Sequence, residues 1–74
     1  MQRFFFDVDD GERQVHDAIG KSLVNVEMAA LEADVLLRSL AALKLMQSRP
    51  GRTFVRVRDA EGKRVHEGST YLEG

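Results

Sequence analysis

The chain has 74 residues, of which 43% are apolar and 31% are charged, and its formal net charge is −1. This length suits one domain with a thin core, and such a core is commonly reinforced by disulfides, a metal or a partner chain. The absence of cysteine excludes disulfides and thiolate zinc sites, and the near-neutral charge excludes a global attraction to nucleic acid or anionic membranes.

No secretory leader and no membrane span are expected. The N-terminal residues lack a basic region followed by an apolar run. No stretch approaches the roughly 18 consecutive apolar residues of a transmembrane helix. We therefore expect a cytoplasmic protein with no membrane partner.

The first predicted element is a β-hairpin. Residues 3–9 are aromatic and β-branched, and the returning strand is expected over 12–16, with Val15 facing the core. Between the two strands lies Asp10-Gly11. This dipeptide favours a type I′ turn, because both central residues of that turn need positive φ.

A turn and a long helix follow. Asp17 and Gly20 occupy the first and fourth positions of a predicted β-turn, and residues 21–24 are expected to be a short extended link. Asn25 is a predicted N-cap for a helix over 26–47, a run without Gly or Pro that is rich in Ala, Leu and Glu. The Arg-Pro-Gly sequence that follows disfavours helix and should end it.

A second hairpin is predicted after the helix. Strict alternation over 53–58 indicates a strand with two different faces, and its partner is expected over 63–67. Gly62 supplies the left-handed residue of a four-residue loop. Residues 68–74 show no clear pattern and are expected to be an irregular tail. The predicted fold is α+β: a two-layer ββαββ domain with a four-stranded antiparallel sheet and one long helix on one face.

The predicted helix has two apolar stripes on opposite sides. The first stripe is expected to pack on the sheet and form the core; it contains Val26, Ala29, Ala30, Ala33, Leu36, Leu37, Leu40 and Leu43. The second stripe, called the outer strip below, contains Met28, Leu31, Val35, Ala42, Leu45 and Met46.

The outer strip predicts self-association. An apolar strip rimmed by charge is typical of helix–helix contacts between chains. Predicted strands of about 17–20 Å should also leave part of the helix beyond the sheet. The alternative is that these residues are scattered exposed apolar groups, which are normal on any surface. We expect a homo-oligomer, most simply a twofold dimer, and a different protein partner is a further alternative.

The sheet face turned away from the helix is expected to combine arginine and aromatic side chains, because alternate strand residues point to opposite faces. The residues on this face are Arg3, Phe5, Phe54, Arg56, Arg58 and Arg64, with Asp7, Gln14, His16 and His66 beside them. Basic groups interleaved with aromatic rings suit nucleic-acid backbones and stacked bases. Pairing of arginine with Asp7 and packing of Phe5 on Phe54 explain the same pattern without a ligand.

No catalytic machinery is recognisable. The sequence has no Ser/His/Asp or Cys/His arrangement, no Gly-rich phosphate loop and no metal-ligand cluster. Asp9 and Asp10 are explained as turn residues, and a metal site at His16 and His66 requires that their strands bring them together. We predict no catalytic residue, no metal and no cofactor.

Several motifs of the chain occur together in a known family. They are Phe4-Phe5-Phe6-Asp7-x-Asp9-Asp10-Gly11, Asp17-x-x-Gly20, Asn25 before an Ala-rich helix, and Val55-x-Val57-x-Asp59-x-x-Gly62. Over residues 3–66 the chain resembles the small domain-of-unknown-function proteins common in rhizobia and related alphaproteobacteria. The resemblance implies one helix between two strand pairs and no established activity. The chain is more loosely similar to HicB-like antitoxins, but it lacks the Pro-Gly-Cys-type segment that they carry before the helix. This similarity is an analogy of fold only.

These observations favour a non-catalytic interaction or regulatory protein. Its expected contact surface is the outer strip, through which the chain forms a homo-oligomer. The alternative is a nucleic-acid-binding or antitoxin-like regulator that uses the face with arginine and phenylalanine.

Overall fold

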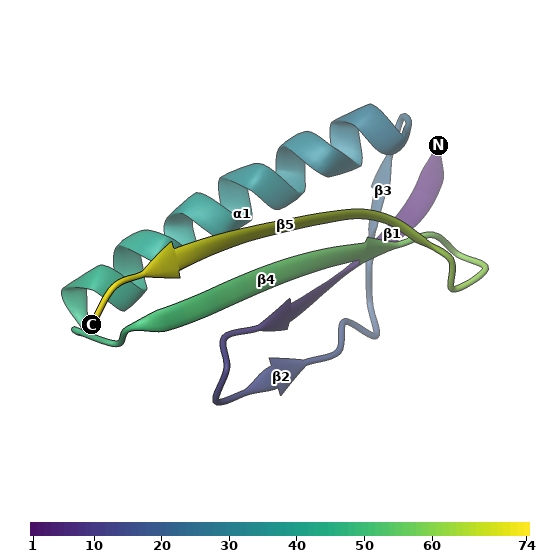
Figure 1. Cartoon of the computed structure of the whole chain (residues 1–74). Coiled ribbons are helices and arrows are strands. Elements are labelled where there is room, and N and C mark those ends of the chain that lie inside the picture. The colour runs from purple at the N-terminus through teal and green to yellow at the C-terminus, as the bar shows by residue number, and fades with distance from the viewer.

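The chain folds into two layers, one helix and one antiparallel sheet (Figure 1). The computed structural model describes all residues from Met1 to Gly74. In chain order the elements are β1 (Gln2–Asp9), β2 (Gln14–Val15), β3 (Lys21–Leu23), α1 (Val26–Met46), β4 (Gly51–Arg58) and β5 (Arg64–Leu72). The strand order is β2-β1-β4-β5, and β3 pairs with β1 beside this path. The α+β class is confirmed, with five strands instead of the predicted four.

The first hairpin is shorter than predicted. Asp9 pairs with Gln14, so the loop spans 10–13, and Asp10 does not take the positive φ of a type I′ turn. The carboxylates of Asp9 and Asp10 accept hydrogen bonds from the loop amides and stabilise this wider loop. As a result β2 keeps only two residues, and Val15 is 58% exposed. The expected longer strand and the core position of Val15 are wrong.

The turn at Asp17 and Gly20 forms as predicted and also packs on β1. One carboxylate oxygen of Asp17 accepts hydrogen bonds from the N–H groups of Ile19 and Gly20, each at 3.0 Å. The other accepts from the Phe6 N–H of β1, also at 3.0 Å. Because the turn is tied to β1, the residues after it pair with β1 as β3, where only an extended link was expected.

The helix α1 begins and ends close to its predicted bounds. Asn25 is extended, and its side-chain oxygen accepts a hydrogen bond from the Met28 N–H at 2.9 Å, which satisfies one free amide of the first turn. After the helix, Ser48 adopts a φ of 52° and Gly51 a φ of 117°, and these left-handed residues direct the chain into β4. The helix does not combine the length and the apolar character that a membrane crossing requires.

The strands β4 and β5 form the longest pair of the sheet. Their register runs from Gly51 opposite Leu72 to Arg58 opposite Arg64, and Gly62 closes the loop with a φ of 85°. The expected irregular tail from residue 68 is therefore wrong up to residue 72. At about 3.4 Å per strand residue and about 1.5 Å per helix residue, the nine residues of β5 match the 21 residues of α1 in length. The expected overhang of the helix is wrong for the same reason.

The core lies between α1 and strands β1 and β4. Its buried apolar members are Phe4, Ala29, Ala33, Leu37, Val55 and Val57. Two members of the predicted core stripe are more exposed than expected: Val26 is 36% exposed and Leu43 is 47% exposed. Val26 lies in the first helical turn and Leu43 lies at the margin of the stripe. The small side chains of Ala29 and Ala33 allow the middle of α1 to approach the sheet closely.

Candidate functional site

The outer strip covers the side of α1 that faces away from the sheet. All six of its members are exposed: Met28, Leu31, Val35, Ala42, Leu45 and Met46. The exposed fractions are 57% for Leu31, 61% for Val35 and 63% for Leu45. Large apolar groups are thus exposed along one side of the helix in the single chain.

The predicted arginine and aromatic residues come together on the opposite face of the molecule. On this outer sheet face, the Arg58 guanidinium lies 4.8 Å from the centroid of the Phe5 ring. The Arg56 guanidinium lies 4.5 Å from the centroid of the Phe54 ring. Both distances suit cation–π contacts. The rings therefore contact arginines, and the alternative packing of Phe5 on Phe54 does not account for them.

The two central arginines are bound by carboxylates. Arg58 donates two hydrogen bonds to Asp7, at 2.7 and 3.1 Å, and a third to the backbone carbonyl of Asp17 at 2.7 Å. Arg56 donates to Glu67 at 2.7 Å, and Asp9 lies 3.7 Å away on its other side. Each arginine thus lies across the sheet from an acid, and their charges largely cancel.

The pKa values support this pairing. The hydrogen bond from Arg58 lowers the pKa of the Asp7 carboxyl, and it outweighs burial, which acts in the opposite direction. In return, the hydrogen bond to Asp7 raises the pKa of Arg58. Both groups are consequently ionised at neutral pH. A phosphate approaching Arg58 would have to compete with a carboxylate already bound in a bidentate arrangement.

The peripheral arginines of this face also have partners. Arg3 donates to the Ile19 carbonyl at 2.8 Å and to the Ser22 hydroxyl at 3.4 Å. Arg64 lies 3.6 Å from Glu67. The face therefore contains the predicted basic residues; carboxylates pair with Arg56, Arg58 and Arg64, whereas Arg3 is bound only by a carbonyl and a hydroxyl.

The two histidines lie on opposite faces of the sheet. His16 lies on the outer face, with its Nδ1 3.6 Å from Asp7. His66 was expected beside it, but it faces α1, with its Nε2 3.5 Å from Asp34 and buried without a hydrogen bond. The bulge between Val57 and Arg58 shifts the register of this part of β5, which explains the error. A metal site shared by His16 and His66 is excluded by this geometry.

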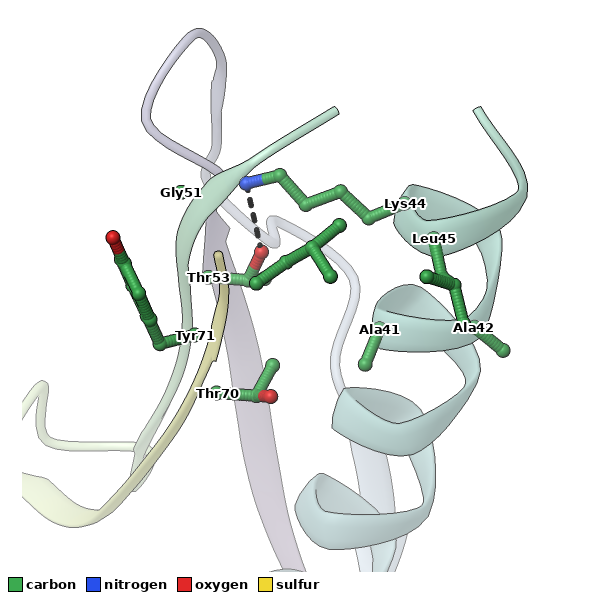
Figure 2. Close-up of a pocket in the computed structure, with 9 residues that line it drawn as sticks. Ala41, Ala42, Lys44, Leu45, Gly51, Thr53, Thr70 and Tyr71 are labelled. Atoms are coloured by element: carbon green, nitrogen blue, oxygen red, sulfur yellow. Dashed lines mark hydrogen bonds between the residues drawn. The ribbon is translucent and has the colours of Figure 1, made fainter. Parts of the chain in front are cut away.

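Lys44 is a buried polar residue that the sequence analysis missed. Its side chain leaves α1 and reaches β4 (Figure 2), and the residue is only 4% exposed. The ammonium donates to the carbonyl of Asp10 at 2.9 Å, to the Thr53 hydroxyl at 3.3 Å and to the Arg52 carbonyl at 3.5 Å. The helical pattern of the sequence could have indicated this burial. Lys44 lies five helical turns after Val26, which places it on the core side of α1.

Comparison with known proteins identifies the family of the chain. No curated protein and no solved structure matches it. A family model described as a domain of unknown function, DUF6894, matches residues 3–70, a range that takes in the whole helix and nearly all of the sheet. The chain therefore belongs to the DUF6894 family.

Proposed function

We propose that this protein is a non-catalytic interaction protein that self-associates through the outer strip of α1. The observation that carries the proposal is the exposure of all six strip residues on one helix side. In a monomer this surface would remain in water. Pairing two such helices would remove it from water, and each Å² of apolar surface buried contributes about 25 cal/mol.

The thin core supports the same proposal. Only eight of the 74 residues are buried, and two of these are polar. A domain with so small a core gains much of its stability from additional burial, and the chain has no cysteine to supply a disulfide. A second copy is the simplest source of that burial, since it presents the same strip.

The non-catalytic part of the proposal rests on how the polar groups are used. The carboxylates of Asp7, Asp10 and Asp17 bind backbone amides or arginines of the chain itself. Lys44 is likewise occupied by backbone and hydroxyl oxygens. These groups hold the loops and strands together, and this role accounts for their positions without a substrate.

Sedimentation velocity over a range of concentrations tests self-association. We expect the wild type to be dimeric at tens of micromolar and Leu45→Glu to be largely monomeric, because the new carboxylate would be buried unpaired in the contact. Ala60→Glu, in the exposed β4–β5 loop, adds the same charge away from α1 and is the matched control. A wild type that stays monomeric at these concentrations overturns the proposal.

Nucleic-acid binding by the outer sheet face remains the alternative prediction. It has less support than self-association, because carboxylates of the chain bind Arg56 and Arg58. If this face bound nucleic acid, the affinity for mixed DNA or RNA would fall steeply with salt, since phosphate contacts release counterions. A mobility-shift assay at low salt, with Arg56→Gln as the variant, distinguishes this function from self-association.

A further inference from the structure

The two edges of the sheet are built differently. At one edge β1 is bordered by the short strands β2 and β3, and between them the Asp17 carboxylate accepts from the Phe6 N–H. This edge offers no continuous row of free backbone groups. At the other edge β5 runs for nine residues and pairs only with β4, so its second side has no strand partner.

The free side of β5 lacks the features that usually protect an edge strand. Natural edges carry lysine, proline, bulges or a covering segment. From Glu67 to Leu72 the strand has neither lysine nor proline, and the only bulge of the β4–β5 pair lies beyond this stretch, near Val57 and Arg58. Long unprotected edges of this kind pair readily with another strand.

The flank of α1 above this edge is also uncovered. A hollow of about 230 Å³ lies there, lined by Ala41, Ala42 and Leu45 of the helix and by Thr70 and Leu72 of β5. Figure 2 shows Ala41 directed from the helix toward the strands, while the Tyr71 ring lies on the far side of them. A second hollow, of about 260 Å³, continues along the helix past Asp34 and Arg38. An added strand beside β5 would lie directly beneath this flank.

We propose that β5 pairs antiparallel with β5 of a second copy, about a twofold axis at Gly68, so that one sheet runs through both subunits. This inference rests on the proposed self-association, and it narrows the contact from the whole outer strip to the edge of the strip nearest β5, where Ala42 and Leu45 lie. Because α1 packs on both β4 and β5, a strand spacing of about 4.8 Å would bring the two helices about 10 Å apart. Packed helices are separated by about 8–10 Å.

The centres of β5 and α1 coincide, which a twofold axis requires. Gly68 is the middle residue of β5, and Leu36 is the middle residue of α1. A Cβ at Gly68 would lie 3.2 Å from the Leu37 side chain, so the middle of the strand lies under the middle of the helix. One axis can therefore relate both strands and both helices along their full lengths.

Charge complementarity favours a second copy of the chain as the partner that pairs with β5. Asp34 and Arg38 line the uncovered flank. Asp34 lies two residues before Leu36, and Arg38 lies two residues after it. A twofold axis at that point brings Asp34 opposite Arg38 of the partner subunit, and it does so twice. Arg38 is exposed and forms none of the ion pairs within the chain, so its charge is available. An unrelated extended peptide would bring neither this charge pattern nor a helix to cover Leu45.

Hydrogen exchange followed by NMR tests the strand pairing directly. In a monomer, alternate amides of β5 point away from β4 and exchange quickly. In the proposed dimer these amides bond to the partner strand, so we expect their protection to rise at least tenfold between low micromolar and submillimolar protein. Dimerisation by the outer strip alone leaves their exchange unchanged, and that result overturns the strand pairing while the proposed function stands.

Charge exchange tests the helix contact. We expect Arg38→Asp and Asp34→Arg each to raise the dimer dissociation constant roughly tenfold, since like charges then face one another. The double variant D34R/R38D should return it to within about threefold of the wild type. Arg13→Asp, in the distant β1–β2 loop, is the charge-matched control.

Val35→Glu separates the two dimer geometries. Val35 belongs to the outer strip but does not line the hollows beside β5. We expect it to change the dissociation constant by less than about threefold, whereas Leu45→Glu abolishes the dimer. A monomeric wild type overturns both proposals. If Val35→Glu breaks the dimer and D34R/R38D does not restore the affinity lost in the single charge variants, only the strand pairing is overturned.

Discussion

Lys44 brings a positive charge into the contact between α1 and β4 without a carboxylate to balance it. All three of its N–H bonds are directed at neutral oxygens, two of them backbone carbonyls. The arrangement ties the last turns of the helix to the β1–β2 loop through Asp10 and to β4 through Thr53. Removing the ammonium would leave these acceptors without a donor in a buried place, which is more harmful than losing an exposed hydrogen bond.

We therefore predict that Lys44→Met destabilises the protein by about 2–3 kcal/mol, although methionine fills a similar volume. Urea unfolding at pH 7 and fixed protein concentration measures the change. Lys21→Met is the control, because Lys21 is exposed and its ion pair with Glu32 is expected to contribute no more than about 1 kcal/mol. Equal losses for the two variants would show that the buried bonds of Lys44 add nothing beyond a surface charge.

At the level of elements, the turn between β2 and β3 depends on a close approach of backbones. Gly20 has a φ of 75°, and a Cβ at this position would lie 2.8 Å from the Phe4 carbonyl oxygen and 2.9 Å from the Phe5 ring. Alanine would thus meet both an unfavourable φ and a steric clash with a strand that cannot move freely. This close approach allows Asp17 to reach the Phe6 amide and positions β3 beside β1.

Gly20→Ala should destabilise the protein by more than about 2 kcal/mol, combining the cost of a left-handed alanine with displacement of β1. Gly62→Ala is the matched control. Gly62 has a φ of 85°, and a Cβ added there would meet no atom within 4 Å, so only the conformational cost of about 1 kcal/mol applies. Thermal unfolding of the two variants separates the two contributions. Similar losses would contradict a role for the contact with β1.

The elements that local chemistry determines could be predicted from the sequence. The N-cap at Asn25, the turn at Asp17 and the loop closed by Gly62 each depend on groups a few residues apart. The pairing of β3 with β1 and the extension of β5 depend on distant partners. In the segment from Gly68 to Leu72, glycine, serine and threonine obscure the alternation, so its strand character arises from β4 alone.

The exposure of the outer-strip residues could be predicted from the sequence, but the ion pairs of the outer sheet face could not. All six outer-strip residues are exposed, because helical periodicity determines which side chains share a side. The outer sheet face was also placed correctly at Phe5, Arg56 and Arg58. The ion pairs on this face could not be predicted, since the pairing of Arg56 with Glu67 depends on the register between β4 and β5.

In the whole molecule, three aspartates join segments that are distant in the sequence. Asp7 binds Arg58 of β4, Asp17 binds the amide of Phe6, and Asp10 binds Arg49 at 2.7 Å. The amides of the loop and Arg49 lower the pKa of Asp10 far below its usual range. For Asp17, burial raises the pKa, but the combined amide hydrogen bonds outweigh it and the net pKa is lowered. The carboxylate forms of all three, Asp7 included, are favoured by folding.

These lowered pKa values predict acid sensitivity of the fold. A carboxyl whose folded pKa lies below its unfolded value of about 3.9 stabilises the protein fully above that value, and the stabilisation is lost as the pH falls toward the folded pKa. We expect the free energy of unfolding of the wild type to be nearly constant from pH 7 to pH 5. It should decrease from about pH 4 to pH 2, because the unfolded chain then binds more protons than the folded one.

Asp10→Asn isolates one contribution to this dependence. At pH 6 the variant should be less stable than the wild type by about 1 kcal/mol or more, since it loses the charge-assisted bond to Arg49. The difference should shrink as the pH falls from 4 to 2, because Asp10 of the unfolded wild type then binds a proton, which favours unfolding, while the amide of the variant does not titrate. Glu61→Gln removes one negative charge from the β4–β5 loop, where Glu61 forms no ion pair, and controls for net charge. Urea unfolding at half-unit pH intervals measures the stability of all three proteins. Asp10 is assigned as an acid-sensitive link between the first hairpin and the end of α1. A stability difference between wild type and Asp10→Asn that stays constant down to pH 2 would contradict this assignment.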